Sequence, residues 1–241
     1  KLWIRGGFPD SYLAPVDELS LGWRENFIRT FLERDLGQMD IRLPATTMRR
    51  FWVMLAHLHG QTINYSKLGQ SLDVSHTTIK RWLDVLEQTF MIRTLRPMES
   101  NLKKRLVKSP KVYIRDSGLL HALLEIETFD HLMGHPIVGA SWEGFCLETL
   151  ISSFTKGRFS FFRTTSGQEV DCIYERNKKR IGFEIKLSSA PQIARGTYSC
   201  VGDLDLTHLF VISPVGEAYP LTKDVTAADV LTVVDRVEGL L

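Results

Sequence analysis

Apolar residues recur at helical spacing near the start of the chain. Between residues 16 and 36, Trp23 and Phe27 fall on one apolar stripe with charged residues outside it, which predicts a surface helix. A second amphipathic helix is predicted over residues 46–60. Residues 1–15 are rich in Gly, Pro and aromatic residues, and we expect them to be irregular.

The next segment has the pattern of a helix-turn-helix followed by a β-hairpin. The predicted elements are helices at 65–72 and 76–89, strands at 90–95 and 111–116, and a closing helix at 117–126. Ser75 is the predicted N-cap of the second helix, and Gly69 is the small residue that permits a close crossing. The two strands enclose a basic loop, so this segment predicts a winged helix.

The rest of the chain alternates helices and strands. An amphipathic helix at 141–154 precedes three strands, then a helix, a buried strand and a terminal helix beginning at Thr226. The sequence therefore predicts an α/β protein with three parts. These are a helical junction at 1–44, a winged helix-turn-helix domain at 45–130 and an α/β domain at 131–241.

The composition argues against a membrane-spanning, disulfide-rich or zinc-knuckle protein. The 241 residues are 44% hydrophobic and contain no apolar run of the ~18 to 20 residues that a membrane helix needs. No signal segment is visible, and the three cysteines lack CxxC spacing, which argues against a disulfide scaffold or a zinc knuckle. We therefore expect a soluble, cytoplasmic protein with no membrane partner.

Net charge sets a condition on any nucleic-acid interface. The formal charge is only +2, so such an interface must come from local clustering of cations. One cluster is visible, and its members are Lys103, Lys104, Arg105, Lys108, Lys111 and Arg115.

A pair of carboxylates marks the candidate for chemistry. If the hairpin over residues 169–188 turns on Asn177 and Lys178, Asp171 lies across from Glu184 on one polar face. Opposed like charges on neighbouring strands repel each other. The repulsion can be relieved by solvent, by protonation of one carboxyl group or by a cation between them.

The cation reading predicts a Mg²⁺ site. Mg²⁺ takes oxygen ligands and is commonly held by one or two carboxylates with waters. Glu143, on the preceding helix, is a candidate third ligand beside Asp171 and Glu184. Lys186 shares the face of Glu184 and is a candidate for orienting a water or stabilising charge on a phosphate. The structural alternatives are a solvated hairpin face and, for Glu143, a favourable place near a helix N-terminus.

These residues resemble a known superfamily. Asp171 followed by Glu184-Ile185-Lys186, after a helix that carries Glu143, is similar to the PD-(D/E)XK nucleases over residues 136–215. The resemblance implies a restriction-endonuclease-like, three-layer α/β domain with a mixed sheet. It also implies that Asp171 and Glu184 bind Mg²⁺, that Lys186 assists catalysis and that Glu143 completes the site. Val170 departs from those members that have Pro before the Asp.

Nearly the whole chain also resembles the C-terminal half of a family of prokaryotic AAA+ type ATPases. The segments that carry the resemblance are LWIRGGFP, WRENFIRTFLERDL, and the later EVD and EIK elements. It implies an ATPase domain preceding Lys1, and we expect such a region in the full protein. The chain has no G-x-x-x-x-G-K-[ST] motif, so no P-loop ATP site is expected within it.

A winged helix also predicts DNA-contacting residues. The candidates are His76, Thr77, Thr78, Lys80 and Arg81 for the major groove, and Lys103, Lys104 and Arg105 in the wing for phosphates. Winged helices also dock proteins. The function hypotheses are therefore a Mg²⁺-dependent DNA nuclease, a non-catalytic DNA- or protein-binding targeting module of the ATPase, and an interaction scaffold.

Overall fold

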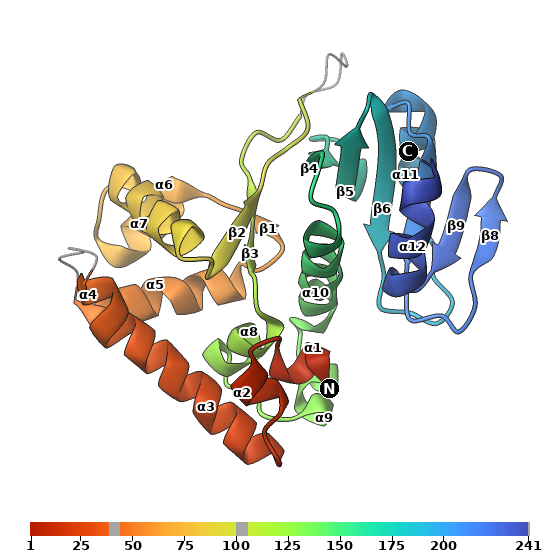
Figure 1. Cartoon of the computed structure of the whole chain (residues 1–241). Coiled ribbons are helices and arrows are strands. Elements are labelled where there is room, and N and C mark those ends of the chain that lie inside the picture. Colours follow the sequence, from red (N-terminus) through yellow and green to blue (C-terminus); the bar gives the residue numbers. More distant parts are fainter. Residues whose placement is uncertain (39–43, 100–105, 241) are drawn as a thin grey trace. The chain divides into compact units, whose positions relative to one another are not determined.

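The computed structural model describes residues 1–38, 44–99 and 106–240 (Figure 1). The chain is a mixed α/β protein that divides into two compact units. Unit 1 comprises residues 1–94 and 111–145, and unit 2 comprises residues 95–110 and 146–241. This division differs from the three predicted parts, because the helical junction shares one hydrophobic core with the helix-turn-helix that follows it.

Unit 1 begins with helices. They are α1 (Leu2–Arg5), α2 (Pro9–Tyr12), α3 (Asp17–Thr30), the π-helix η1 (Phe31–Asp35) and α4 (Leu36–Gln38). The expectation that residues 1–15 are irregular is wrong. Pro9 occupies the first position of α2, where its fixed φ favours a helix and its missing N–H costs nothing.

Buried polar contacts hold this helical segment to α8 (Ser117–Leu123). The Arg24 side chain is 1% exposed, and its guanidinium donates to the carbonyls of Ser20, Ile4 and Gly118. A Cβ atom added to Gly118 would lie 2.2 Å from the Arg5 carbonyl oxygen, so only glycine allows α1 and α8 to approach so closely.

The predicted helix-turn-helix is confirmed at the level of its elements. Helix α5 (Ala45–His57) and strand β1 (Gln61–Thr62) precede helices α6 (Tyr65–Leu72) and α7 (His76–Gln88). The Ser75 hydroxyl accepts from the Thr78 amide at 3.1 Å, which confirms the N-cap. A Cβ atom on Gly69 would lie 2.6 Å from the Val74 carbonyl oxygen, which confirms the close crossing at the turn.

A small sheet accompanies these helices. Strands β2 (Ile92–Leu95) and β3 (Lys111–Ile114) are those predicted, and β1 joins them to give the order β1-β3-β2. Ile79, Trp82, Leu83 and Leu86 of α7 are buried, with Ile79 and Leu86 fully inaccessible. Helices α8 and α9 (Phe129–Gly134) follow, and α10 (Val138–Ser153) contains the boundary between the units.

Unit 2 contains a six-stranded mixed sheet. Its strands are β4 (Arg158–Arg163), β5 (Glu169–Arg176), β6 (Lys179–Ile185), β7 (His208–Ile212), β8 (Tyr219–Thr222) and β9 (Val225–Ala228). The order is β4-β5-β6-β7-β9-β8, in which β6, β7 and β9 are parallel neighbours and the remaining pairs are antiparallel. Helix α11 (Arg195–Asp203) connects β6 to β7, and α12 (Val230–Leu240) ends the chain.

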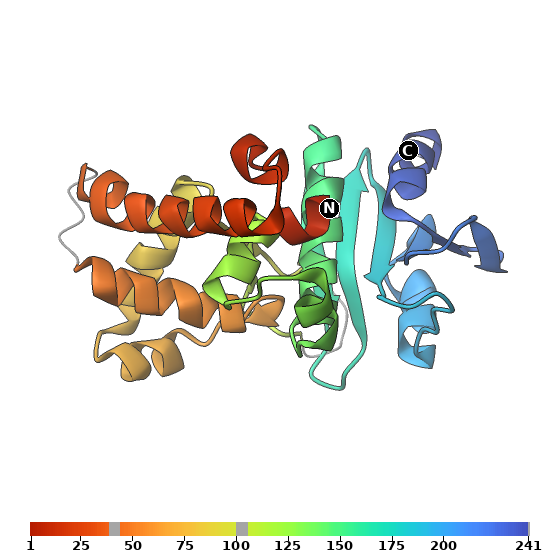
Figure 2. The same cartoon turned by 90° about the horizontal axis from the view of Figure 1, so that it is seen from below.

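Helices cover both faces of this sheet. Cys200 and Leu204 of α11 pack with Ile173 of β5 in one core cluster. Tyr174, the next residue of β5, faces the other way and stacks on Phe154, which follows α10. Figure 2 shows α10 and α11 on opposite sides of the sheet, so unit 2 has the three layers predicted.

The end of the chain differs from its prediction. The expected terminal helix from Thr226 begins only at Val230, because residues 225–228 form β9 beside β7. Strand β8 was not predicted either. Asp229 caps α12 by accepting from the amides of Leu231 and Thr232, at 2.9 and 3.1 Å.

Described residues on either side of the 100–105 gap, at 96–98 and 106–107, lie along β4. The Met98 amide donates to the Phe161 carbonyl at 2.7 Å, the Phe161 amide donates to Arg96 at 3.0 Å, and the Val107 amide donates to Arg163 at 3.0 Å. The described parts of the predicted wing therefore extend the sheet of unit 2. None of the helices described for this chain has the length and apolar character needed to span a bilayer.

Candidate functional site

The hairpin that carries the site turns where the sequence predicted. Asn177 and Lys178 have φ values of 53° and 65°, the left-handed pair that a two-residue hairpin turn requires. Arg176 pairs with Lys179, and the ladder continues in this register to Cys172 opposite Phe183. The predicted register is confirmed over this stretch.

The ladder changes at Asp171. Between the pairs Ser160–Ile173 and Phe162–Val170, β5 has one residue more than β4, which is the pattern of a β-bulge. Val170 and Ile173 consequently share one core cluster, so the predicted unbroken alternation along β5 is wrong. Bulges re-aim side chains, and this one lies at the first carboxylate of the candidate site.

The two carboxylates are buried close together, but not as a simple cross-strand pair. The Asp171 carboxylate accepts a hydrogen bond from the Ile185 amide at 2.9 Å, beyond the last pair of the β5–β6 ladder. Asp171 and Glu184 are 8% and 6% exposed. The alternative of a solvated hairpin face is therefore wrong, and these acids lie in a low-dielectric environment.

Glu184 shows the electrostatic cost of this arrangement. Burial, followed by repulsion from Asp171, raises the pKa of Glu184 to about 7, and the Lys186 ammonium opposes the rise. The Lys186 Nζ atom lies 2.7 Å from Glu184 Oε1. The other oxygen, Oε2, is buried and has no hydrogen-bond partner in the part of the chain that the structure describes. One oxygen atom is thus available to a further positive group.

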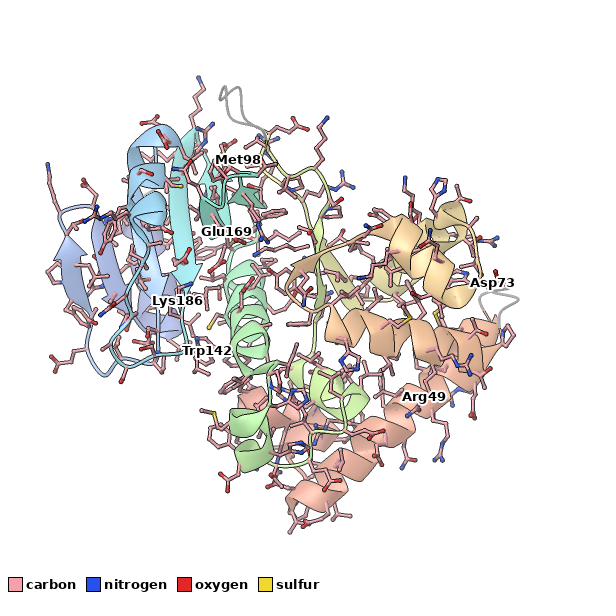
Figure 3. All side chains as sticks on the ribbon, turned by 180° about the vertical axis from the view of Figure 1, so that it is seen from behind. Arg49, Asp73, Met98, Trp142, Glu169 and Lys186 are labelled. Atoms are coloured by element: carbon pink, nitrogen blue, oxygen red, sulfur yellow. The ribbon has the colours of Figure 1, made fainter. Side chains whose placement is uncertain are left out.

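Neighbouring elements hold Lys186 and Glu169 in place (Figure 3). The Lys186 amide donates to the Ile212 carbonyl of β7 at 2.9 Å, which fixes the backbone just after β6. The Glu169 carbonyl accepts from the Thr197 hydroxyl of α11 at 3.3 Å, and the Glu169 carboxylate lies 3.5 Å from Arg163.

Sequence reasoning missed the buried Ser213 beside this site. Its hydroxyl donates to the Ser188 carbonyl and so connects the end of β7 to the segment after Lys186. The position directly after the buried strand HLFVI was the available signal, since such ends of neighbouring parallel strands meet at one edge of a sheet.

Glu143, the predicted third ligand, belongs to unit 1. Its Oε1 accepts from the Tyr113 hydroxyl and from Lys111 Nζ, the latter at 3.2 Å. Among the described residues, no group of three or more His, Cys, Asp or Glu side chains is arranged to hold a metal ion. The carboxylates that the structure brings together within one unit are Asp171 and Glu184, and the role of Glu143 stays a prediction.

The predicted DNA-contacting residues of α7 lie at its first turns. His76, Thr77, Lys80 and Arg81 are exposed. Thr77 and Thr78 exchange hydrogen bonds with the Ser75 hydroxyl at 2.7 and 2.8 Å, so both threonines take part in the cap of α7. The exposed members of the predicted set therefore offer one imidazole, one hydroxyl and two cations.

The structure removes Lys111 from the predicted basic cluster. Lys103, Lys104 and Arg105 lie outside the described residues. Lys111 is 2% exposed and pairs with Glu143, so its place in a solvent-facing cluster is wrong. The pattern KVYI places Lys111 at the start of a fully buried strand, where only an internal partner can stabilise its charge.

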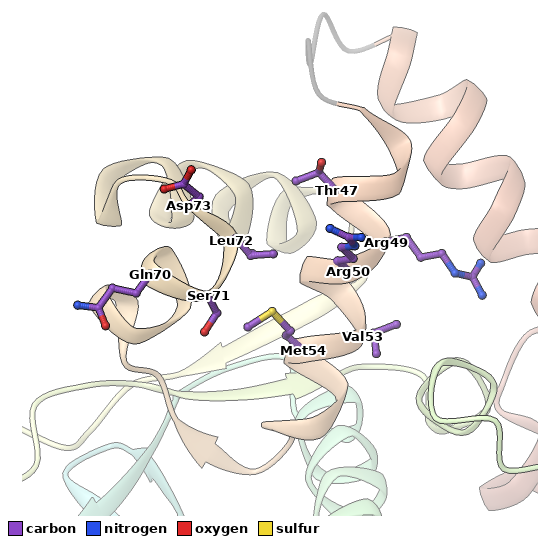
Figure 4. Close-up of a pocket in the computed structure, with 9 residues that line it drawn as sticks. All are labelled: Thr47, Arg49, Arg50, Val53, Met54, Gln70, Ser71, Leu72 and Asp73. Carbon is purple, nitrogen blue, oxygen red and sulfur yellow. The ribbon is translucent and has the colours of Figure 1, made fainter.

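Unit 1 also has a pocket that the sequence did not indicate. It has a volume of about 600 Å³ and lies between α5 and the end of α6, lined among others by Arg50, Met54 and Leu72. Figure 4 shows the Arg50 side chain on the α6 side of α5 and Arg49 extending away from α6.

Comparison with known proteins places the chain in a family. The family described as "Domain of unknown function (DUF8612)" matches residues 1–130, which is more than half of the chain. The chain belongs to the DUF8612 family. A second family, described as "Domain of unknown function (DUF4143)", matches residues 138–232. The DUF4143 region includes all of β4 to β9, and therefore Asp171, Glu184 and Lys186.

Longer proteins of two mycobacteria are similar to this DUF8612 chain. They are Uncharacterized protein Rv2008c of Mycobacterium tuberculosis and Uncharacterized protein Mb2031c of Mycobacterium bovis. Each is 44% identical over 243 residues, covering 100% of this chain and 55% of the relative. The chain therefore spans about half the length of these relatives. No solved structure matches it.

Proposed function

We propose that unit 2 is a Mg²⁺-dependent nuclease-like domain that hydrolyses phosphodiester bonds of DNA. The observation that carries the proposal is the environment of Glu184. This carboxyl group is buried beside a second carboxylate, has one oxygen without a partner among the described residues, and has a pKa raised to about 7. A buried acid with a strongly perturbed pKa and a specific charged neighbour is typical of a functional site.

The side chains fit a hard cation. Asp171 and Glu184 supply carboxylate oxygens, the donor type that Mg²⁺ prefers, and Glu184 Oε2 is the buried oxygen that such an ion would satisfy. Positive charge there would also relieve the repulsion that raises the pKa of Glu184. We infer that Asp171 and Glu184 hold the ion, with waters as further ligands.

The protein's own groups have distinct roles in this proposal. When bound, Mg²⁺ supplies Lewis-acid polarisation of a phosphoryl oxygen and lowers the pKa of a bound water. The Ile185 amide fixes the orientation of the Asp171 carboxylate by hydrogen bonding. Lys186, whose side chain is 40% exposed, favours the charged form of Glu184 and reaches solvent, where its ammonium can orient a water or a phosphate oxygen.

The order of elements supports the assignment. Helix α10, strands β4, β5 and β6, helix α11 and strand β7 follow one another as in the core of the PD-(D/E)XK superfamily that the motif resembles. In unit 1, the order α5, β1, α6, α7, β2, β3 is that of a winged helix, and we propose that α7 contacts DNA. The resemblance to AAA+ type proteins leads us to propose an ATPase region in the full-length relatives.

The test measures ion binding and cleavage separately. Wild-type protein is titrated with Mg²⁺ or Mn²⁺ while thermal stability and plasmid cleavage are followed, and the isosteric variant Glu184→Gln is treated identically. We expect stabilisation and cleavage in the wild type and loss of both in the variant. Glu217→Gln, which changes an exposed carboxylate of the same unit, is the control and should behave as the wild type does. Ion-dependent stabilisation that Glu184→Gln retains would exclude this site.

One observation favours a non-catalytic alternative. Glu143 is engaged by Lys111 and Tyr113, which leaves two carboxylates for the ion where the resembled superfamily often has three. In this alternative the protein recognises DNA or a protein partner without cleaving it and serves to target the ATPase. It predicts salt-dependent DNA binding that needs no divalent ion and no nicking at any Mg²⁺ or Mn²⁺ concentration.

A further inference from the structure

A basic pocket lies at the tip of the β5–β6 hairpin, outside every site predicted from the sequence. Its volume is about 620 Å³. Four of its lining residues are cations, Lys156, Arg158, Arg176 and Lys178, and the only carboxylate that lines it is Glu175. The lining therefore has an excess of positive charge, which suits an anionic ligand.

The arginines of this pocket and its carboxylate are engaged in ion pairs. Glu175 lies 2.8 Å from Arg180 and 2.9 Å from Arg158. The hydrogen bond from Arg180 and then that from Arg158 lower the pKa of Glu175 and keep it charged. Arg176 pairs with Glu238 at 3.0 Å. These contacts stabilise the walls of the pocket.

The two lysines differ from the arginines. Lys156 and Lys178 are both exposed, and neither has an ion-pair partner among the residues that the structure describes. Their charges thus make no visible contribution to the fold, and they remain available to a ligand.

The backbone nevertheless holds both lysines at fixed places. The Lys156 carbonyl accepts from the Tyr174 hydroxyl. Gly157 follows with φ of 97°, and a Cβ atom there would lie 2.5 Å from the Tyr174 ring, so the chain is held tightly against β5. A pre-organised site loses less conformational entropy when a ligand binds.

Lys178 occupies a costly position for a lysine. Its φ of 65° is the left-handed conformation, and Asn-Gly is the strongly favoured pair for this kind of turn. Glycine at residue 178 would make the turn easier to form, yet a cation is present there. Because lysine does not stabilise this turn, binding of a ligand explains the cation more simply than stability of the hairpin does.

Spacing connects the pocket with the carboxylate pair on the same strand. Asp171 and Arg176 are five positions apart on β5, which corresponds to roughly 17 Å at the rise of an antiparallel strand. A DNA duplex rises about 3.4 Å per base pair, so about five base pairs span that distance. One duplex can therefore reach both ends of the hairpin.

We propose that the hairpin-tip pocket binds the phosphate backbone of the DNA duplex on which unit 2 acts, with Lys156 and Lys178 as its principal contacts. This inference rests on the proposed function, and it names the surface that positions the substrate away from the carboxylates. The ligand chemistry is the phosphodiester oxygen, which lysine ammonium groups neutralise without reading sequence.

The decisive variant is Lys178→Gly, because it removes the charge while improving the turn. We expect a melting temperature equal to or above that of the wild type, together with weaker DNA binding. Fluorescence anisotropy with a labelled duplex in EDTA is measured over a series of salt concentrations. Loss of one phosphate contact should lower affinity by about tenfold near ~50 mM salt and reduce the salt slope by about 0.9.

A matched control is available in the same sheet. Lys223 is an exposed lysine in the β8–β9 turn, so Lys223→Gly removes the same charge from another strand connection. We expect it to bind DNA as the wild type does. The double variant Lys156→Gln/Lys178→Gly should lose affinity and salt slope further than Lys178→Gly alone.

The outcomes separate this inference from the proposed function. Wild-type affinity and slope in the double variant would overturn it, as would equal losses in Lys223→Gly or an absence of duplex binding by the wild type. Nuclease activity is tested independently by Mg²⁺ stabilisation and cleavage in Glu184→Gln. Binding that depends on the tip lysines without any cleavage would support the pocket and reject hydrolysis.

Discussion

Two buried histidines of unit 1 and one buried glutamate of unit 2 have pKa values shifted in opposite directions. In unit 1, burial lowers the pKa of His59 to about 3 and of His121 to about 4, so both imidazoles stay neutral in the folded protein. The Arg24 guanidinium donates hydrogen bonds to three backbone carbonyls. In unit 2, Glu184 and Asp171 are two like charges buried side by side.

This difference separates groups that support the fold from groups that oppose it. A neutral His121 is useful to unit 1, because its two ring nitrogens bond the Ile4 carbonyl and the Ser141 hydroxyl at 3.1 and 2.7 Å. An ionised Glu184 has no equivalent benefit for stability, since its Oε2 lacks a partner within the described chain. Buried charged groups that lower stability and have no compensating contact are therefore the ones to test for function.

The sequence provides separate probes of the two units. All five tryptophans, Trp3, Trp23, Trp52, Trp82 and Trp142, belong to unit 1. All three cysteines, Cys146, Cys172 and Cys200, belong to unit 2 and are buried. Tryptophan fluorescence therefore reports unfolding of unit 1, and thiol labelling reports opening of unit 2.

The largest expected effect is an opposite response of the two units to acid. The folded pKa values of His59 and His121 lie below the ordinary 6.5, so these two imidazoles destabilise unit 1 as pH falls from 6.5 towards 4, while the buried Asp116, whose pKa is raised by desolvation, acts in the opposite sense. The loss due to the two imidazoles is on the order of 5 kcal/mol. The folded pKa of Glu184 lies above its ordinary 4.5, so Glu184 stabilises unit 2 as pH falls from 7 to 4.5, while His208, whose pKa is lowered by burial, acts in the opposite sense.

Denaturant titrations at a series of pH values, followed by fluorescence and by thiol labelling, measure both responses. If the unfolding free energies from fluorescence and from thiol labelling changed with pH in the same direction, the comparison would be contradicted. Acid would then affect the stability of both units alike.

The next largest effect concerns a structural charge of unit 1. Arg24→Ala should cost about 3 to 5 kcal/mol at any pH from 5 to 8, because it removes a buried guanidinium that donates to three carbonyls. Tryptophan fluorescence in urea measures the loss. Arg29→Ala, an exposed position of the same helix, is the control and should stay within about 0.5 kcal/mol of the wild type. A mild Arg24→Ala variant would show that the network is dispensable.

Replacing a buried acid of unit 2 should have the reverse sign. At pH 8 in EDTA, Glu184→Gln is expected to stabilise unit 2 by up to about 3 kcal/mol, because it removes a buried charge whose pKa is raised to about 7. Near pH 4.5 the effect should vanish. Thiol-labelling rates across urea concentrations provide the measurement. Destabilisation at pH 8 would indicate that ionised Glu184 supports the fold after all.

The smallest effect tests a local, uncharged contact. Ser75→Ala should reduce the stability of unit 1 by about 1 kcal/mol, because the Thr78 amide loses its cap. This loss should be independent of pH, unlike those above. Ser71→Ala, on exposed α6 surface, serves as the comparison. Equal stability of both variants, measured by fluorescence in urea, would argue against the N-cap.

Local rules predicted much of the fold. Asn177 and Lys178 were sufficient to predict the hairpin register, because a two-residue turn leaves one pairing from Arg176 to Cys172. Helices α6 and α7 followed from periodicity and from Ser75 as the N-cap. The end of the chain was harder, since residues 225–240 have no Gly or Pro between strand and helix until Gly239. Asp229 was the available signal, as an N-cap residue.

The candidate site was predictable only in its residue types. The sequence indicated that Asp171, Glu184 and Lys186 belong together, yet it did not show the bulge that buries Asp171 and directs its carboxylate to the Ile185 amide. A bulge depends on pairing with β4, which lies outside the hairpin itself. The hydrogen-bond partners of the Glu143 carboxylate, Lys111 and Tyr113, were likewise not predictable, because they are distant in the sequence.

The hydrogen bonds along β4 also bear on how the protein avoids aggregation. An uncovered outer strand offers unpaired amides and carbonyls to a strand of another molecule. Here Arg96, Met98 and Val107 occupy those groups at Phe161 and Arg163, and Pro220 removes a donor from the opposite outer strand, β8. Both borders of the sheet are therefore poor templates for intermolecular β-pairing, and shortening the 95–110 segment should make unit 2 prone to self-association.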